Sequence, residues 1–193
     1  MNHYPHHLIF EGAELCGKSF LMSQVYDVLE RRYNKSGNVL DGCHWFNCDV
    51  GIFGTAHGLP CLRSYLDIME ELKDSNLLLE KFYLSDKIYN RLYNKMERDY
   101  RVIESRLREL AFKIIAIKVD PDPEIFQKRL QDRLKLYPHY ERIAHTPDWY
   151  LRQQEEYQAE LKKTSLPYLE IDLTRIPNPT AVDKIFSWLG ENK

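Results

Sequence analysis

The amino-acid sequence predicts an α/β fold of three layers, in which helices cover both faces of a five-stranded parallel sheet. Short apolar runs alternate about five times with segments of helical periodicity. The inner runs, such as Ile114–Ile117, are continuously apolar and do not alternate with polar residues, which is typical of strands buried on both faces. With 193 residues and no interdomain linker, we expect one domain spanning residues 1–193.

In the first half of the chain, strands are predicted at His7–Phe10, within Asn38–Cys48 and at Asn76–Glu80. Helices are indicated between them, because apolar residues recur at helical spacing over residues 21–29 and 62–72. The first helix is expected to end near residues 34–37, where Asn and Gly favour a C-terminal cap. Residues 49–60 hold three glycines and a proline, and are expected to form a loop.

In the second half, residues 86–110 are expected to be mostly helical, and residues 113–119 to form a strand. Asp122 and Pro123 then supply a cap and a first-turn proline for the next helix. Residues 137–145 break the pattern, and Thr146 with Pro147 begins another helix. The last strand is expected at residues 168–172 and the last helix at residues 181–189.

Composition excludes several classes of protein. Hydrophobic residues make up 44% and charged residues 29% of the chain, as in ordinary globular proteins. The 27 basic and 29 acidic residues are nearly balanced, which disfavours a dedicated nucleic-acid-binding protein. No apolar stretch approaches the roughly 20 residues that span a bilayer. Met1–His7 lacks the apolar segment of a signal peptide and is predicted to be a short tail. We therefore expect a cytoplasmic protein with no nucleic-acid or membrane partner.

A glycine-rich stretch directly after the first predicted strand matches the P-loop pattern G-x-x-x-x-G-K-[ST]. Its glycines allow a tight turn that brings backbone N–H groups onto phosphate oxygens, and the following helix directs its positive dipole end at the same anion. In this pattern Lys18 reaches the β- and γ-phosphates and Ser19 holds Mg²⁺, so the sequence predicts a site for ATP and Mg²⁺. The predicted ATP-binding residues are Gly12, Ala13, Glu14, Leu15, Cys16, Gly17, Lys18 and Ser19.

Three motifs, spread over nearly the whole chain, resemble those of the thymidylate kinase family. Phe10–Ser19 is similar to F-E-G-x-D-x-x-G-K-[ST], and Glu80–Asn90 resembles D-R-Y-x-x-S-x-x-A-Y-Q. Tyr140–Ile143 is similar to the L-D-R-I that closes the family's lid. The resemblance implies a P-loop kinase-type three-layer fold with a helical lid at about residues 129–146. It also implies a kinase of nucleotide biosynthesis that transfers the γ-phosphoryl group of ATP to a nucleoside monophosphate, dTMP first of all.

The resemblance also implies roles around the acceptor. Glu80 would orient Mg²⁺ through water, or accept the proton of a hydroxyl acceptor. Glu14 would approach the sugar 3′-hydroxyl, and Tyr89 would stack against the sugar. Lys81 and Arg63 would hold the acceptor.

The lid arginines Arg129, Arg133 and Arg142 would close over the phosphates and stabilise charge on the transferring group. Arg129 and Arg133 are four residues apart, so they share one helical face. Leu15 stands where some thymidylate kinases carry a P-loop arginine. Any arginine that the transfer needs would therefore come from the lid.

The sequence also departs from the family, and these departures leave the acceptor open. Glu80 and Lys81 replace Asp and Arg, and lysine offers charge without a bidentate fork. The segment R-E-P-G-G-T is absent, and Leu59 stands where a base-stacking aromatic is expected, a role that Trp45 or Phe46 would have to fill. The alternatives are a kinase of the same fold that acts on a nucleoside or another small hydroxyl compound, and a nucleotide-binding module without catalysis. The resemblance also implies a homodimer.

Cysteine spacing raises one further alternative. The four cysteines are too few for a disulfide scaffold and are expected to be reduced. A zinc ion held by Cys43, Cys48, His57 and Cys61 is a minor alternative, because their spacing fits no compact zinc motif closely. The competing interpretation is that Cys43 and Cys48 flank a buried strand.

Overall fold

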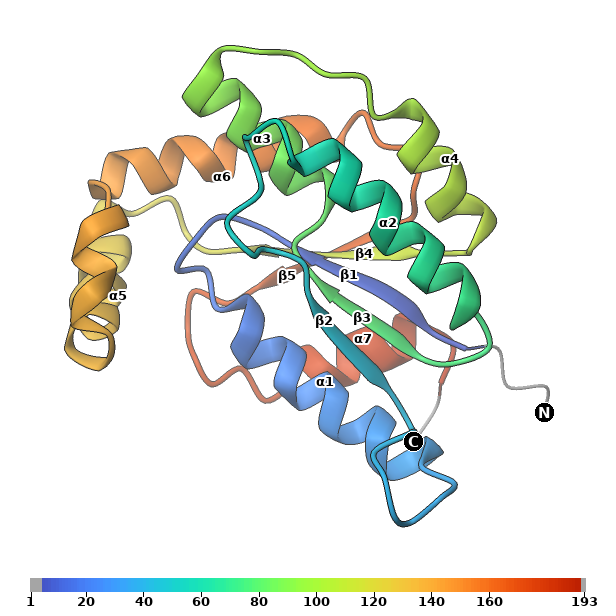
Figure 1. The fold of residues 1–193 in the computed structure, drawn as a ribbon. Coiled ribbons are helices and arrows are strands. Elements are labelled where there is room, and N and C mark those ends of the chain that lie inside the picture. Colours follow the sequence, from blue (N-terminus) through green and yellow to red (C-terminus); the bar gives the residue numbers. More distant parts are fainter. Residues whose placement is uncertain (1–4, 192–193) are drawn as a thin grey trace.

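The central layer is a five-stranded sheet, seen in a computed structural model that describes residues 5–191 (Figure 1). Most of the predicted N-terminal tail lies outside these residues. All strand pairs are parallel, and the order across the sheet is β2-β3-β1-β4-β5. This confirms the predicted parallel sheet. The strands are β1 (His7–Glu11), β2 (His44–Asn47), β3 (Leu77–Glu80), β4 (Lys113–Lys118) and β5 (Tyr168–Asp172).

Helices cover both faces of the sheet, as predicted. In Figure 1, α1 and α7 lie on one face, and α2, α3, α4 and α6 lie on the other. α5 and the short 3-10 helix η1 stand beyond the carboxyl ends of the strands and pack against each other. The helices are α1 (Lys18–Tyr33), α2 (Gly58–Glu71), α3 (Tyr83–Asn94), α4 (Arg101–Glu109), α5 (Pro123–Leu136), η1 (Pro138–Ile143), α6 (Pro147–Leu161) and α7 (Ala181–Trp188).

The structure refines two of the predicted elements. Residues 86–110 are not one helix, because Lys95 takes a left-handed conformation (φ 51°) and its N–H bonds back to the end of α3. An irregular stretch follows before α4. The predicted loop 49–60 is shorter, since α2 already begins at Gly58.

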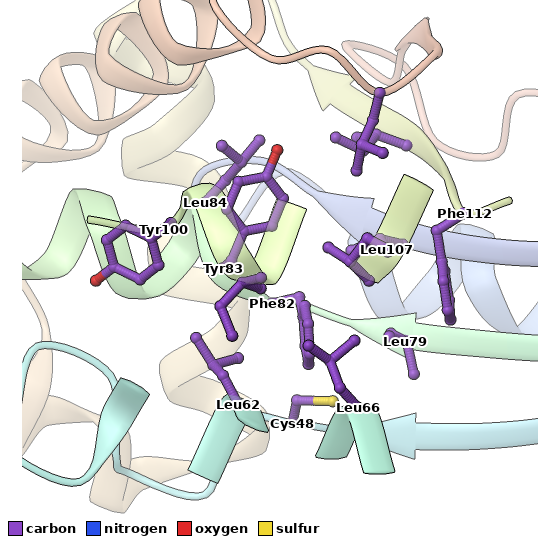
Figure 2. Packing of buried hydrophobic residues seen from close by; sticks show 14 of the residues in the cluster. Cys48, Leu62, Leu66, Leu79, Phe82, Tyr83, Leu84, Tyr100, Leu107 and Phe112 are labelled. Carbon is purple, nitrogen blue, oxygen red and sulfur yellow. The ribbon is translucent and has the colours of Figure 1, made fainter. Parts of the chain in front are cut away.

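The core divides into two clusters, one on each side of the sheet. The first is formed by α2, α3 and α4 with the end of α6, and Figure 2 shows Cys48 beside Leu66 within it. The second lies under α1, α5 and α7, and contains Cys43. The two cysteines that flank β2 therefore face opposite sides of the sheet, which confirms that they flank a strand. Among the described residues, no helix has the length and apolar character needed to cross a membrane.

Buried Asp86 holds the loop between β2 and α2 in place through a hydrogen bond. Its carboxylate is fully buried and accepts hydrogen bonds from the Gly54 N–H (2.8 Å) and the Tyr100 hydroxyl (2.7 Å). Gly58 passes so close that a Cβ atom there would lie 2.2 Å from Asp86 Oδ1. The loop can approach α3 this closely only with glycine at position 58.

We expect Gly58→Ala to lower the free energy of unfolding by about 2 kcal/mol, because the added methyl group overpacks a buried carboxylate whose hydrogen bonds hold the loop. Urea denaturation measures the change. Ser64→Ala, on the exposed side of the same helix, is the matched control and should stay within about 0.5 kcal/mol of wild type. Equal stability of Gly58→Ala and Ser64→Ala would contradict the packing argument.

Candidate active site

The P-loop connects β1 to α1 at the carboxyl end of the central strand. Gly12 has a φ of 148°, and a Cβ atom there would lie 2.4 Å from the Ile117 carbonyl oxygen of β4. Glycine is thus required by both backbone conformation and the close approach of two strands. Lys18, at the start of α1, is 94% buried, and its ammonium group donates to the carbonyls of Gly12 (2.8 Å) and Ala13 (2.6 Å). The loop curls around the lysine that the sequence predicts to meet the phosphates.

Ser19 and Glu80 meet at the edge of this loop. Glu80 ends β3, the strand next to β1, and its carboxylate accepts a hydrogen bond from the Ser19 hydroxyl. Hydroxyl and carboxylate oxygens are the hard ligands that Mg²⁺ prefers, so the pair fits the predicted metal position. No group of three or more His, Cys, Asp or Glu residues that could hold a metal occurs in residues 5–191.

Lys81 lies where the sequence predicts the acceptor. It has a left-handed backbone (φ 61°), directly after β3. Its ammonium group forms an ion pair with Asp49, at the end of β2, and lies 3.4 Å from both Glu14 Oε1 and the Tyr89 hydroxyl. Burial acts to lower the pKa of Lys81, but Tyr89, Glu14 and Asp49 together hold it well above the usual value. The side chain is therefore a fixed positive charge between two carboxylates.

Glu14, in the P-loop, accepts hydrogen bonds from three side chains. Its Oε1 is bonded by the Tyr89 hydroxyl as well as by Lys81, and its Oε2 is 2.5 Å from the Tyr140 hydroxyl. Burial raises the pKa of Glu14, but the charge of Lys81 and the two tyrosine hydrogen bonds outweigh it and lower the pKa to about 2. Glu14 is thus ionised at any pH near neutrality. The structure brings together Glu14, Lys81 and Tyr89, three of the four predicted acceptor residues.

The predicted lid corresponds to α5 from Arg129, then η1 and the turn into α6. Arg129 is half-buried, and its guanidinium donates to the carbonyls of Leu15 (2.8 Å) and Thr174 (3.2 Å) and also to that of Leu173. Arg133 is exposed and stacks on the rings of Tyr137 (4.7 Å) and Tyr140 (5.3 Å). Two of the three predicted arginines therefore hold the P-loop and η1 in place.

Arg63 and Arg142 lie apart from these contacts. Arg63 is exposed on α2 and Arg142 is exposed on η1. Within the described part of the chain, neither forms a hydrogen bond or ion pair with the other site residues. Their predicted roles in holding the acceptor and the phosphates remain predictions.

Sequence reasoning missed three residues of the site. Asp49 follows β2 at the same sheet edge as Glu80, so the position of carboxyl strand ends was an available signal. Tyr140 of η1 belongs to the third motif, but that motif assigns it no contact with Glu14. Gln153 of α6 gave no local signal, because it reaches the P-loop only through the fold. The Gln153 carbonyl oxygen accepts the Glu14 N–H at 2.7 Å. The side-chain nitrogen of Gln153 is buried and has no hydrogen-bond partner. Among the described residues, every other buried side-chain nitrogen or oxygen has one.

A series of stacked aromatic rings begins at Tyr89, which contacts both Lys81 and Glu14. Tyr89 stacks on Tyr93 (5.4 Å between ring centroids), and Tyr93 stacks on Trp149 (5.8 Å). Trp149 stacks in turn on His145 (4.0 Å). Trp45, named as a possible base platform, packs instead against Tyr26 of α1. The aromatic surface near the acceptor residues comes from α3 and the start of α6.

The structure overturns the zinc alternative. Cys43 and Cys48 belong to core clusters on opposite sides of the sheet, while His57 is exposed at the start of α2. Burial and the nearby Glu30 carboxylate raise the pKa of Cys43 to about 12, and burial also raises the pKa of Cys48. Zinc binds thiolates, which these environments disfavour. The four side chains do not form a metal site.

Solved structures, two named kinases among them, share this fold. YorR protein from Bacillus subtilis, solved in complex with phosphorylated GDP, has a TM-score of 0.65 at 17% identity, with 95% of each chain covered. Deoxyadenosine kinase from M. mycoides, solved with dCMP and dCDP, has a TM-score of 0.58 at 13% identity, covering 95% of this chain and 98% of that one. Thymidylate kinase from Ehrlichia chaffeensis has a TM-score of 0.57 at 11% identity, covering 97% of this chain and 100% of that one.

These similarities establish the fold class. The chain has the three-layer α/β/α fold of P-loop kinases, with a five-stranded parallel sheet, as predicted. No protein-family model and no curated protein sequence matches the chain.

The reactivity of the cysteines tests the conclusion that they do not hold a zinc ion. We expect only Cys61, the one partly exposed cysteine, to react quickly with a thiol reagent at pH 8, since Cys16, Cys43 and Cys48 are buried. All four should react after unfolding in urea. Protein purified without chelator should contain no stoichiometric zinc. Rapid labelling of Cys43 or Cys48, or one equivalent of zinc per chain, would contradict this assignment.

Proposed function

We propose that the chain is an ATP- and Mg²⁺-dependent phosphotransferase that acts on a small-molecule acceptor. The observation that carries the proposal is the convergence of Lys18, Ser19 and Glu80 around one P-loop. The backbone N–H groups of the loop and the amino end of α1 are suited to bind the triphosphate. Lys18 would move from the loop carbonyls to the β- and γ-phosphates. Bound Mg²⁺ would neutralise phosphate charge, and Ser19 and Glu80 would hold it.

The acceptor side favours an uncharged hydroxyl compound. Glu14 and Asp49 place two negative charges around the single positive charge of Lys81. Two unit charges about 6 Å apart repel by about 3 kcal/mol at an effective dielectric constant near 20, so a phosphate dianion would be disfavoured here. A hydroxyl group avoids this repulsion and can donate to either carboxylate.

In such a reaction the chain's own residues position the acceptor and take up its proton. The acceptor oxygen bonds to the γ-phosphorus of ATP as the bond to the β,γ-bridging oxygen breaks and ADP leaves. Asp49 accepts the hydroxyl proton, and Lys81 holds Asp49 in place. Glu14 and Tyr89 orient a second polar group of the acceptor, and the rings of Tyr93 and Trp149 offer a surface for a flat base. A nucleoside combines these features.

dTMP is the second candidate acceptor. The three motifs that resemble thymidylate kinases favour it, and so does the contact between Tyr89 and Glu14, the two residues that the resemblance places around the sugar. In that case the exposed arginines Arg63 and Arg142 would have to turn toward the acceptor phosphate. The nucleotide-binding module without an acceptor is the third reading.

A screen of ATP consumption separates these readings. We expect turnover with at least one nucleoside among a panel of nucleosides, deoxynucleoside monophosphates and simple sugars. Lys18→Ala should abolish it, because the triphosphate loses its phosphate-binding ammonium group, while circular dichroism stays unchanged. Stimulation by dTMP alone would favour the second candidate. ATP binding with no acceptor-dependent turnover, or full activity of Lys18→Ala, would refute the phosphotransferase proposal.

Asp49→Asn tests the chemistry at the acceptor. For a hydroxyl acceptor we expect kcat to fall at least about 100-fold with the KM for ATP unchanged, because the proton-accepting carboxylate is lost. Val50→Ala, an exposed neighbour, should behave as wild type. A phosphate acceptor needs no proton acceptor and is repelled by Asp49, so undiminished or increased turnover in Asp49→Asn would overturn the hydroxyl assignment.

A further inference from the structure

The lid and the following helix hold the P-loop at two neighbouring residues. Arg129 of α5 donates to the Leu15 carbonyl at 2.8 Å, and Gln153 of α6 accepts the Glu14 N–H at 2.7 Å. Tyr140 of η1 donates its hydroxyl hydrogen to Glu14 Oε2 at 2.5 Å. The first two contacts engage the backbone, but the third engages a charged side chain that also faces Lys81. Tyr140 is therefore the lid residue that contacts the acceptor side of the site.

Tyr140 is also coupled to a candidate phosphate-binding arginine. Its ring is 93% buried, and the Arg133 guanidinium lies 5.3 Å from the ring centroid. A hydrogen bond to an ionised carboxylate is stronger than one to a neutral group, and Glu14 is ionised near neutral pH. The position of η1, and of Arg133 stacked on it, thus depends on a bond to the P-loop carboxylate.

We propose that Tyr140 is a positioning residue whose hydrogen bond to Glu14 holds the lid against the P-loop. We call this hydrogen bond the clasp. The clasp holds η1 over the acceptor residues, keeps Arg133 beside the site and excludes water while the phosphoryl group is transferred. This inference rests on the proposed function for its catalytic consequence, although the clasp itself is a structural contact. Closing a site against water prevents hydrolysis of the reactive group.

The test compares Tyr140→Phe with Tyr137→Phe. Both changes remove one hydroxyl group and keep a ring against Arg133, but only Tyr140 bonds to Glu14. In the full-length protein, we expect backbone amides of residues 138–145 to exchange hydrogen roughly tenfold faster in Tyr140→Phe, because a charge-assisted hydrogen bond closing the lid is lost. Tyr137→Phe should exchange as wild type does.

The same variants are then compared in turnover. We expect Tyr140→Phe to raise, roughly tenfold, the ratio of ATP hydrolysed by water to phosphoryl group transferred to the acceptor found in the screen. Tyr137→Phe should leave that ratio unchanged. Glu14→Ala should accelerate exchange in residues 138–145 as well, and adding Tyr140→Phe to it should change exchange less than twofold, because alanine has already removed the acceptor of the Tyr140 bond.

Unchanged exchange in Tyr140→Phe, or fully additive effects of the two changes, would overturn the clasp. Accelerated exchange with an unchanged hydrolysis ratio would overturn its role in excluding water. A wild-type protein that transfers phosphate to no acceptor, yet shows the exchange pattern, would refute the proposed function and leave the clasp standing. The two failures are therefore distinguishable.

Discussion

The carboxylate of Glu14 is the interaction on which the site depends. It lies in the P-loop, accepts hydrogen bonds from Lys81 and Tyr89, and accepts another from Tyr140 of η1. A half-buried charge is costly unless it is paired and hydrogen-bonded, and here every partner comes from a different element. Because these donors share one carboxylate, the hydrogen bonds fix the P-loop, Lys81 with Tyr89, and Tyr140 of η1 relative to one another.

The ion pairs around Lys81 offset its positive charge. A lysine bonded by both Glu14 and Asp49 has little positive charge left to attract an anion, whereas its bonds fix the orientation of the two carboxylates. The left-handed backbone of Lys81 directs the side chain into the site and is uncommon for a residue other than glycine. Such strain is found where the surroundings over-determine a functional geometry. The lysine is therefore better placed to organise carboxylates than to bind a phosphate.

Local patterns account for what the sequence predicted well. Continuous apolar runs such as Ile114–Ile117 indicate buried strands, and the caps before α5 and α6 indicate where helices begin, because both depend on neighbouring residues alone. The pattern from Gly12 to Ser19 likewise combines local backbone requirements with local chemistry. The zinc alternative failed because spacing along the chain does not tell which side of a strand each residue faces.

Contacts between distant elements account for what the sequence could not provide. Tyr140 and Gln153 are 126 and 139 residues from Glu14, and nothing in their local sequence indicates that they meet it. The break between α3 and α4 comes at Lys95, whose left-handed backbone ends α3. Asp49 was predictable in part. Its place after β2 follows from the sequence, but its ion pair with Lys81 depends on β2 lying next to β3 in the sheet.

Arg129 and Arg133 also differ in contacts that their local sequence does not reveal. The Arg129 guanidinium already bonds to three backbone carbonyls, and burial lowers its pKa, so turning it toward a phosphate would leave those carbonyls without their donor. The Arg133 guanidinium stacks on two tyrosine rings and forms no hydrogen bond or ion pair with any residue in the range 5–191. Arg133 can therefore serve the transferring phosphoryl group without disturbing the P-loop, whereas Arg129 stabilises the loop itself. Two arginines on one helical face thus differ in the groups that their guanidiniums contact, which their spacing alone does not reveal.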